Sequence, residues 1–146
     1  MNLSDKALSR LLFSLFLLDM VLSGVSLLFP QTWFLIFHDR PYIDPQGLLR
    51  RTGGTWLAFS LLQLLAYRRW KENPHWLMLI AGVRLSDIFS DAIYLAIAEH
   101  VTFLGKLGLL IAPPSNLWIG WVLWRAYLRR RKTGHSVEVP GEDEGG

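Results

Sequence analysis

Four ionisable side chains lie well inside two stretches of the sequence that are otherwise largely apolar. Asp19 stands in the middle of the first stretch, and Arg84, Asp87 and Asp91 follow one another closely in the third. In apolar surroundings, carboxylates and a guanidinium pair with each other, relay protons or anchor the polar group of a ligand. These residues are therefore the first candidates for a functional site.

Helical periodicity brings the charged residues of the third stretch together. At the helical angle per residue, Arg84, Asp87 and Asp91 fall within an arc of about 60°. Each charge near the centre of a bilayer costs roughly 2.5–3.5 kcal/mol on insertion, so the charged residues must face other helices rather than lipid. We predict a polar intramembrane cluster of Asp19, Gln63, Arg84, Asp87 and Asp91.

The composition indicates that the surrounding elements are membrane-spanning helices. Of the 146 residues, 51% are hydrophobic and 18% are charged, whereas soluble domains carry about 25% charged residues. Apolar runs long enough to cross a bilayer are expected to be helices, because hydrocarbon offers no water to unpaired backbone groups. The four apolar runs are Leu8–Phe29, Gly53–Tyr67, Trp76–Ala98 and Thr102–Leu128.

We therefore expect an all-α integral membrane protein in which residues 1–132 form a single bundle of four transmembrane helices. The second run, at about 15 residues, is marginal for a span. The first is interpreted as a retained span, because it is longer than the core of a signal peptide and contains Asp19. The short connection Arg68–His75 makes the second and third spans antiparallel neighbours.

The distribution of Lys and Arg predicts the orientation. With both termini on one side, that side carries ten of these residues, and the other side carries Arg40, Arg50 and Arg51. The more basic side is expected in the cytoplasm. This pattern accounts for the net charge of +3 without a nucleic-acid partner. The ten residues are Lys6, Arg10, Arg68, Arg69, Lys71, Arg125, Arg129, Arg130, Arg131 and Lys132.

Two segments outside the spans have expected roles. The first outer loop contains Trp33–Phe37, which is apolar but too short to span, and we expect it to lie along the membrane surface. Residues 133–146 end in Glu-Asp-Glu-Gly-Gly and lack apolar periodicity. We expect them to form a flexible acidic cytoplasmic tail.

The fourth span contains a double proline that is expected to kink it. Pro113 and Pro114 lack amide hydrogens and clash with the preceding turn. Ser115 and Asn116 are close enough to donate to the carbonyls that this frees. Alternatively, the helix starts at Pro114, and Val101–Ala112 forms a separate short segment.

The sequence contains no motif of a known catalytic or metal-binding type. There is no cysteine, and no Gly-rich phosphate loop, nucleophile elbow or zinc-protease motif is present. His38, His75, His100 and His135 share no helix at metal-binding spacing. We therefore expect no catalytic residue, metal or cofactor, although an enzyme is not excluded.

The order of segments resembles that of a known family. The first span, its following proline and the surface segment lead to Leu48-Leu49-Arg50-Arg51-Thr52-Gly53-Gly54, an Arg-x-Gly-Gly entry into the second span. From Leu8 to Leu128, this layout resembles the DoxX-like group of small four-helix bacterial membrane proteins. The resemblance implies a four-helix fold in a bacterial cytoplasmic membrane, and it implies no catalytic residues.

Three functions are compatible with these features. The first is a non-catalytic accessory or scaffolding subunit of a membrane complex, or a homodimer, in which the polar cluster locks the helices. The second is an intramembrane pocket that binds or transforms a lipophilic small molecule. The third is a proton-coupled small transporter that uses Asp19 as its carrier.

Overall fold

The structure is a computed structural model that describes residues 3–44 and 47–134. The described residues form helices joined by short connections, which confirms the all-α class. Outside the helices, one β-bridge within the described part of the chain pairs His38 with Val101. The helices are α1 (Asp5–Leu28), α2 (Pro30–Phe37), α3 (Leu48–Arg69), α4 (His75–Ile97) and α5 (Phe103–Gly134).

The boundary residues explain where α1 and α2 begin. The hydroxyl of Ser4 accepts a hydrogen bond from the backbone N–H of Ala7 at 3.2 Å, so it caps α1. Proline disfavours helical geometry in the residue before it, and Phe29, which precedes Pro30, has a φ of −130°. Pro30 then opens α2, because the first position of a helix needs no N–H. The apolar segment Trp33–Phe37 is therefore the end of a short helix.

Helix α3 is longer than the apolar run that predicts it. It starts at Leu48 rather than Gly53 and has 22 residues. The carboxylate of Asp44 accepts hydrogen bonds from the backbone N–H groups of Leu48 and Leu49, at 2.6 and 3.0 Å. These bonds satisfy donors of the first helical turn, so the helix extends through the polar residues before the apolar run.

Two of the described helices, α1 and α5, are long and apolar enough to cross a membrane, judged by length and composition alone. Helices α3 and α4 have similar lengths, with 22 and 23 residues. These two helices are less apolar: α3 has two arginines near each end, and Arg84, Asp87 and Asp91 lie close together in the middle of α4.

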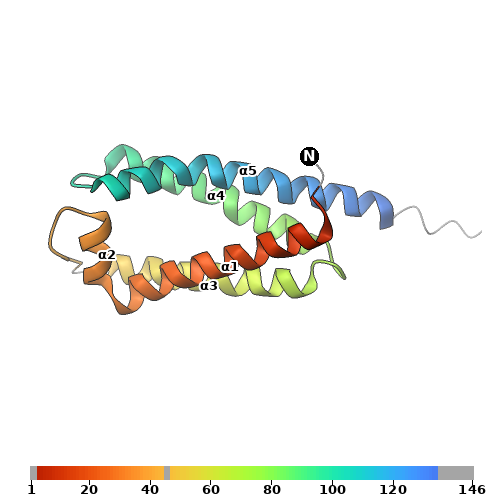
Figure 1. The fold of residues 1–146 in the computed structure, drawn as a ribbon, viewed down its shortest axis with the longest axis horizontal. Coiled ribbons are helices and arrows are strands. Elements are labelled where there is room, and N and C mark those ends of the chain that lie inside the picture. The colour runs from red at the N-terminus through yellow and green to blue at the C-terminus, as the bar shows by residue number, and fades with distance from the viewer. Residues whose placement is uncertain (1–2, 45–46, 135–146) are drawn as a thin grey trace, which may run out of the picture.

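The four long helices pack as two antiparallel pairs (Figure 1). Helix α1 packs along α3, and α4 packs along α5, whereas α3 and α4 contact each other much less. Consecutive α3 and α4 are thus antiparallel, as expected, but neither is the other's main packing partner. The two pairs converge near the α3–α4 connection and diverge toward α2 (Figure 1).

The apolar core occupies the end of the molecule where the pairs converge, which we call the packed half. All of its large buried side chains come from the start of α1, the end of α3, the start of α4 and the end of α5. They include Leu8, Leu12, Trp70, Leu77, Ile80, Leu123 and Tyr127. The opposite end, which we call the open half, comprises Ser23–Leu28, α2, Leu48–Trp56, Phe89–Ile97 and Phe103–Ala112.

In the open half, the end of helix α2 contacts the start of α5. The hydroxyl of Thr102 donates to the carbonyl oxygen of Ile36 at 2.7 Å, and its backbone N–H donates to that of Phe37 at 3.1 Å. Gly105 is buried at this contact, and glycine is required there because a Cβ would collide with the Phe37 carbonyl. The sequence pattern does not predict this contact.

The double proline lies inside α5 without interrupting it. Phe103–Gly134 is assigned as one helix, so the alternative of a separate segment before Pro114 is wrong. The kink at Pro113 and Pro114 stays a prediction. At its other end, α5 includes Thr133 and Gly134, which the sequence analysis assigned to the tail. The remainder of the expected tail, with His135, lies outside the described residues.

Candidate functional site

A polar seam between α1 and α3 positions the first acidic residue of the site. Asp19, Ser23 and Ser26 follow the helical period and are all buried on the α1 face that meets α3. The hydroxyl of Ser23 donates to the carbonyl oxygen of Gly53 at 2.8 Å. In α3, the hydroxyl of Ser60 donates to the Phe16 carbonyl at 3.2 Å. Small residues and hydroxyls thus let the two backbones approach closely.

Gly53 is required by this close approach. A Cβ at this position would lie 2.9 Å from Cγ of Leu27 and would also collide with the hydroxyl of Ser26. The neighbouring Gly54 has nothing within 4 Å of an added Cβ. Of this glycine pair, only Gly53 therefore serves the close packing of α1 against α3.

Asp19 is the centre of the buried cluster. Its carboxylate accepts a hydrogen bond from the Gln63 amide at 2.7 Å and an ion-paired hydrogen bond from Arg84, both at the same oxygen. The three side chains come from α1, α3 and α4, and all three are buried. The predicted inward orientation of Asp19, Gln63 and Arg84 is therefore confirmed.

The other two predicted acids occupy less buried positions. Nη1 of Arg84 lies 3.6 Å from the carboxylate of Asp87, whose side chain is 21% exposed. Asp91 is one turn farther along α4 and accepts a hydrogen bond from the Asn116 amide of α5 at 3.4 Å. Arg84 thus pairs with Asp19 and Asp87, and Asp91 connects α4 with α5.

Asn116 is the site residue whose role the sequence analysis missed. We expected its amide to serve the carbonyls freed by the double proline, whereas the structure directs it to Asp91. A buried asparagine in an apolar helix needs a polar partner. A search for a carboxylate on another helix would have given Asp19, Asp87 and Asp91 as candidates without choosing among them.

Two buried polar atoms near the centre of the cluster have no hydrogen-bond partner within the described part of the chain. They are Oε1 of Gln63 and Nε of Arg84, an acceptor and a donor. An unpaired buried polar atom costs about 1–3 kcal/mol. The Asp19–Gln63–Arg84 contact therefore leaves one acceptor and one donor of the cluster unsatisfied.

The described histidines are outside this cluster, although the His38–Val101 bridge places His38 and His100 in neighbouring segments. Nε2 of His38 lies 2.9 Å from the Tyr94 hydroxyl, and Nδ1 of His75 lies 3.0 Å from the Asn73 side chain. His100 contacts Arg40. Burial lowers the pKa of His38 from its ordinary value. Within residues 3–44 and 47–134, no group of His, Asp and Glu side chains has the geometry of a metal site.

Comparisons with known proteins identify no relative of this chain. No family model matches the chain, and no curated protein or solved structure matches it significantly. The DoxX-like resemblance stays a prediction, and the functional argument rests on the geometry described above.

Proposed function

We propose that the chain is a small polytopic membrane protein that acts as a non-catalytic accessory or scaffolding subunit. In this proposal, α1, α3, α4 and α5 all span the membrane. Their 24, 22, 23 and 32 residues correspond to about 33–48 Å of helix, enough to cross a ~30 Å hydrocarbon core. The proposed location is a bacterial cytoplasmic membrane, as the DoxX-like layout implies.

The ends of the helices support a defined orientation. The start of α1, the α3–α4 connection and the end of α5 lie at the same end of the molecule (Figure 1). These segments carry the ten basic residues counted above. By the excess of Lys and Arg, this end would face the cytoplasm, with both termini inside.

The observation that carries the proposal is the Asp19–Gln63–Arg84 contact. It joins α1 and α3 to α4, and thus joins one helix pair to the other beside the apolar core that the four long helices share in the packed half. Polar side chains hold helices together in membranes, where apolar surfaces alone provide no preference for a partner. The cluster is thus suited to locking two helix pairs in one arrangement.

The open half supports a role in assembly with another membrane protein. From Phe89 to Ile97, no residue of α4 is buried, and the side chain of Phe89 is 72% exposed. Phe103, Leu104, Leu110 and Ile111 of α5 are also exposed. Large apolar surfaces of this kind fit lipid or the transmembrane helix of a partner.

Site-specific photo-crosslinking from Phe89 tests the proposal. A photoreactive residue at Phe89 should give a discrete protein adduct in native membranes, identified by mass spectrometry. The same residue at Leu79, an exposed α4 position in the packed half, is the matched control and should give lipid adducts only. Lipid adducts alone at both positions would contradict the accessory role.

A second candidate function is favoured by the unpaired Gln63 and Arg84 atoms. A lipophilic molecule with a polar group could occupy the cluster, with Arg84 as its anchor and the half-buried Asp87 near it. The protein would then co-purify with a small molecule, detected by mass spectrometry of solvent extracts. A Gln63→Leu variant should lose that molecule, and an empty wild-type protein would reject this candidate.

A further inference from the structure

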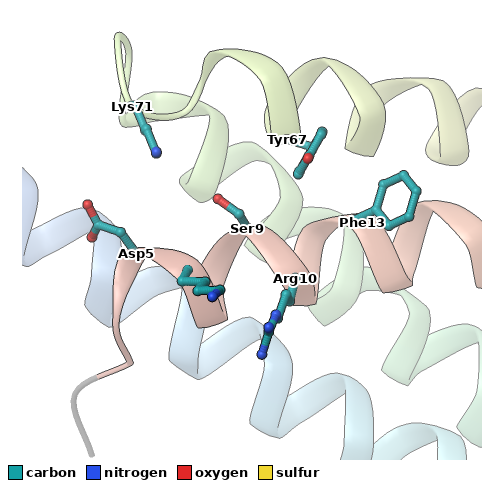
Figure 2. A pocket seen from close by; sticks show the side chains of 7 residues that line it. Asp5, Ser9, Arg10, Phe13, Tyr67 and Lys71 are labelled. Carbon is teal, nitrogen blue, oxygen red and sulfur yellow. The ribbon is translucent and has the colours of Figure 1, made fainter.

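An open surface groove of about 580 Å³, called the cavity below, lies between the start of α1 and the end of α3 (Figure 2). It does not include any residue of the polar cluster. Three cationic side chains line it: Lys6 and Arg10 from α1, and Lys71 from the α3–α4 connection. Its volume is within the usual range of ligand pockets, about 300–1,000 Å³.

The cavity has an excess of positive charge. Lys6, Arg10 and Lys71 form no ion pair with any carboxylate in the described residues. Asp5 is the acid in the wall of the cavity, and its carboxylate is paired with Arg130. Three cations without a paired anion favour a phosphate-type ligand.

Polarity changes along the length of the cavity. Asp5 and Lys71 lie at one end, and the aromatic rings of Phe13 and Tyr67 lie at the other (Figure 2). The ring centroids of Phe13 and Tyr67 are 5.4 Å apart. Phe13 follows Asp5 by about 12 Å along the helix axis. A ligand that fits both ends must be anionic at one end and apolar at the other.

Ser9 lies between these two ends, where it is held in place. Its hydroxyl oxygen accepts a hydrogen bond from the indole N–H of the buried Trp70 at 3.2 Å. The hydroxyl proton of Ser9 remains available to a ligand oxygen, because a serine hydroxyl can donate and accept at the same time. The cavity therefore offers a fixed neutral donor beside its cations.

We propose that this cavity binds the phosphate headgroup of an anionic phospholipid in the cytoplasmic leaflet. The phosphate lies beside Lys71 and Ser9, Lys6 and Arg10 add positive charge from α1, and the glycerol and first methylene groups lie against Phe13 and Tyr67. This inference rests on the proposed membrane orientation, which places the cavity at the cytoplasmic interface. A free inorganic phosphate would share the cationic contacts but would have no apolar part for the aromatic end.

Competitive lipid binding to the purified full chain tests the inference. The protein is mixed in detergent with phosphatidylglycerol and phosphatidylcholine of identical acyl chains, and bound lipid is measured by native mass spectrometry. Phosphatidylglycerol should bind preferentially to the wild type. A Lys6→Gln/Lys71→Gln variant should lose this preference by about fivefold for each cation removed.

The control variant is Arg68→Gln/Arg69→Gln, which removes two exposed cations from the same end of α3 but none from the cavity. It should retain the wild-type preference, and an equal loss in both double variants would overturn the inference. Phe13→Ala should weaken phosphatidylglycerol binding, whereas Leu17→Ala, an exposed position outside the cavity, should not. Far-UV circular dichroism checks that each variant is folded.

Two further measurements separate the possible failures. Displacement of phosphatidylglycerol by inorganic phosphate at constant ionic strength, together with no effect of Phe13→Ala, would indicate a free-anion site and overturn the lipid assignment. Membrane insertion is tested independently by flotation with phosphatidylcholine vesicles and resistance to alkaline carbonate. Failure of insertion would contradict the proposed function. An inserted protein without lipid preference would contradict only the present inference.

Discussion

The packed half and the open half are built from the same helices but bury different kinds of residue. In the packed half, large side chains such as Leu12, Trp70 and Leu77 are fully buried. The buried residues of the open half are all small, namely Ser23, Ser26, Pro30, Gly53 and Gly105. One half is thus held by side-chain packing, and the other by close backbone contact and hydrogen bonds.

The comparison shows that apolar character does not identify the core of this chain. Phe89 and Ile93 are as apolar as Leu77 and Ile80, yet the first two are exposed and the last two are buried. Lipid tails are as apolar as leucine, so an exposed apolar face carries no penalty in a membrane. The polar residues are the better guide to the interior.

The largest effect is expected at the boundary between the halves. Asp19→Leu leaves Arg84 buried without its main partner, because Asp87 is 3.6 Å away and partly exposed. The free energy of unfolding in detergent should fall by about 3–5 kcal/mol. Calorimetry or denaturant titration measures this change.

The double variant Asp19→Leu/Arg84→Leu sharpens this result. With both charges removed, no unpaired charge remains buried, and most of the lost stability should return. A double variant as unstable as the single variant would show that the ion pair is not what holds the two helix pairs together.

A second prediction compares the two halves of α4 directly. Leu77→Ala leaves a cavity in the packed half and should lower the free energy of unfolding by about 2–4 kcal/mol. Leu95→Ala, at an exposed position in the open half, leaves no cavity and should have little effect. If both variants lost the same unfolding free energy, the two halves of the isolated protein would not differ in side-chain packing.

A third prediction concerns the seam of small residues in the open half. Gly53→Ala places a methyl group against Leu27 and the Ser26 hydroxyl, so the unfolding free energy should fall by about 1–2 kcal/mol. Gly54→Ala is the matched control, because an added Cβ there has nothing within 4 Å. Thermal unfolding of the two variants separates packing from helix propensity.

The smallest effect is expected at His38, which lies next to the contact between α2 and α5. Protonation of its partly buried imidazole should lower the stability of this contact. Burial lowers the pKa of His38 below its ordinary value of 6.5. The unfolded segment therefore binds a proton more readily than the folded one. Stability from this site is fully present above about pH 6.5, and it is lost as the pH falls from there through the lowered pKa.

Hydrogen exchange of the α2–α5 contact measures this dependence. Protection of the backbone N–H of Thr102, which donates to Phe37, should decrease from pH 7 to pH 5 in the wild type after correction for intrinsic exchange. His38→Gln removes the titrating group and should make the protection independent of pH over this range. The same decrease in both proteins would exclude His38 as its source.

Much of the candidate site was predictable, because a charged side chain in an apolar helix is costly unless it faces another helix. The inward positions of Asp19, Gln63 and Arg84 follow from the cost of exposing them to lipid and from the helical period. The pairing of Asp91 with Asn116 did not follow. Periodicity gives the face on which a residue lies but not which helix that face meets.

The helix boundaries also divide into those that local sequence predicts and those that depend on contacts seen only in the structure. The start of α2 at Pro30 was predictable from local chemistry, whereas the start of α3 at Leu48 depends on capping by Asp44. The contact of Thr102 with Ile36 depends on two segments that are distant in the chain. A pattern within one segment contains no information about such a contact.

The sequence by itself determined the all-α class, the approximate positions of the long helices and the residues that must turn inward, because backbone hydrogen bonding and the cost of burying charge act locally. Only the tertiary structure decided that Arg84 pairs with Asp19 and Asp87, that α1 packs on α3 and α4 on α5, and that one half of the molecule is packed and the other open. Apolar faces interact without strong directional preference. The choice among them is therefore made by small residues such as Gly53 and by polar contacts between helices.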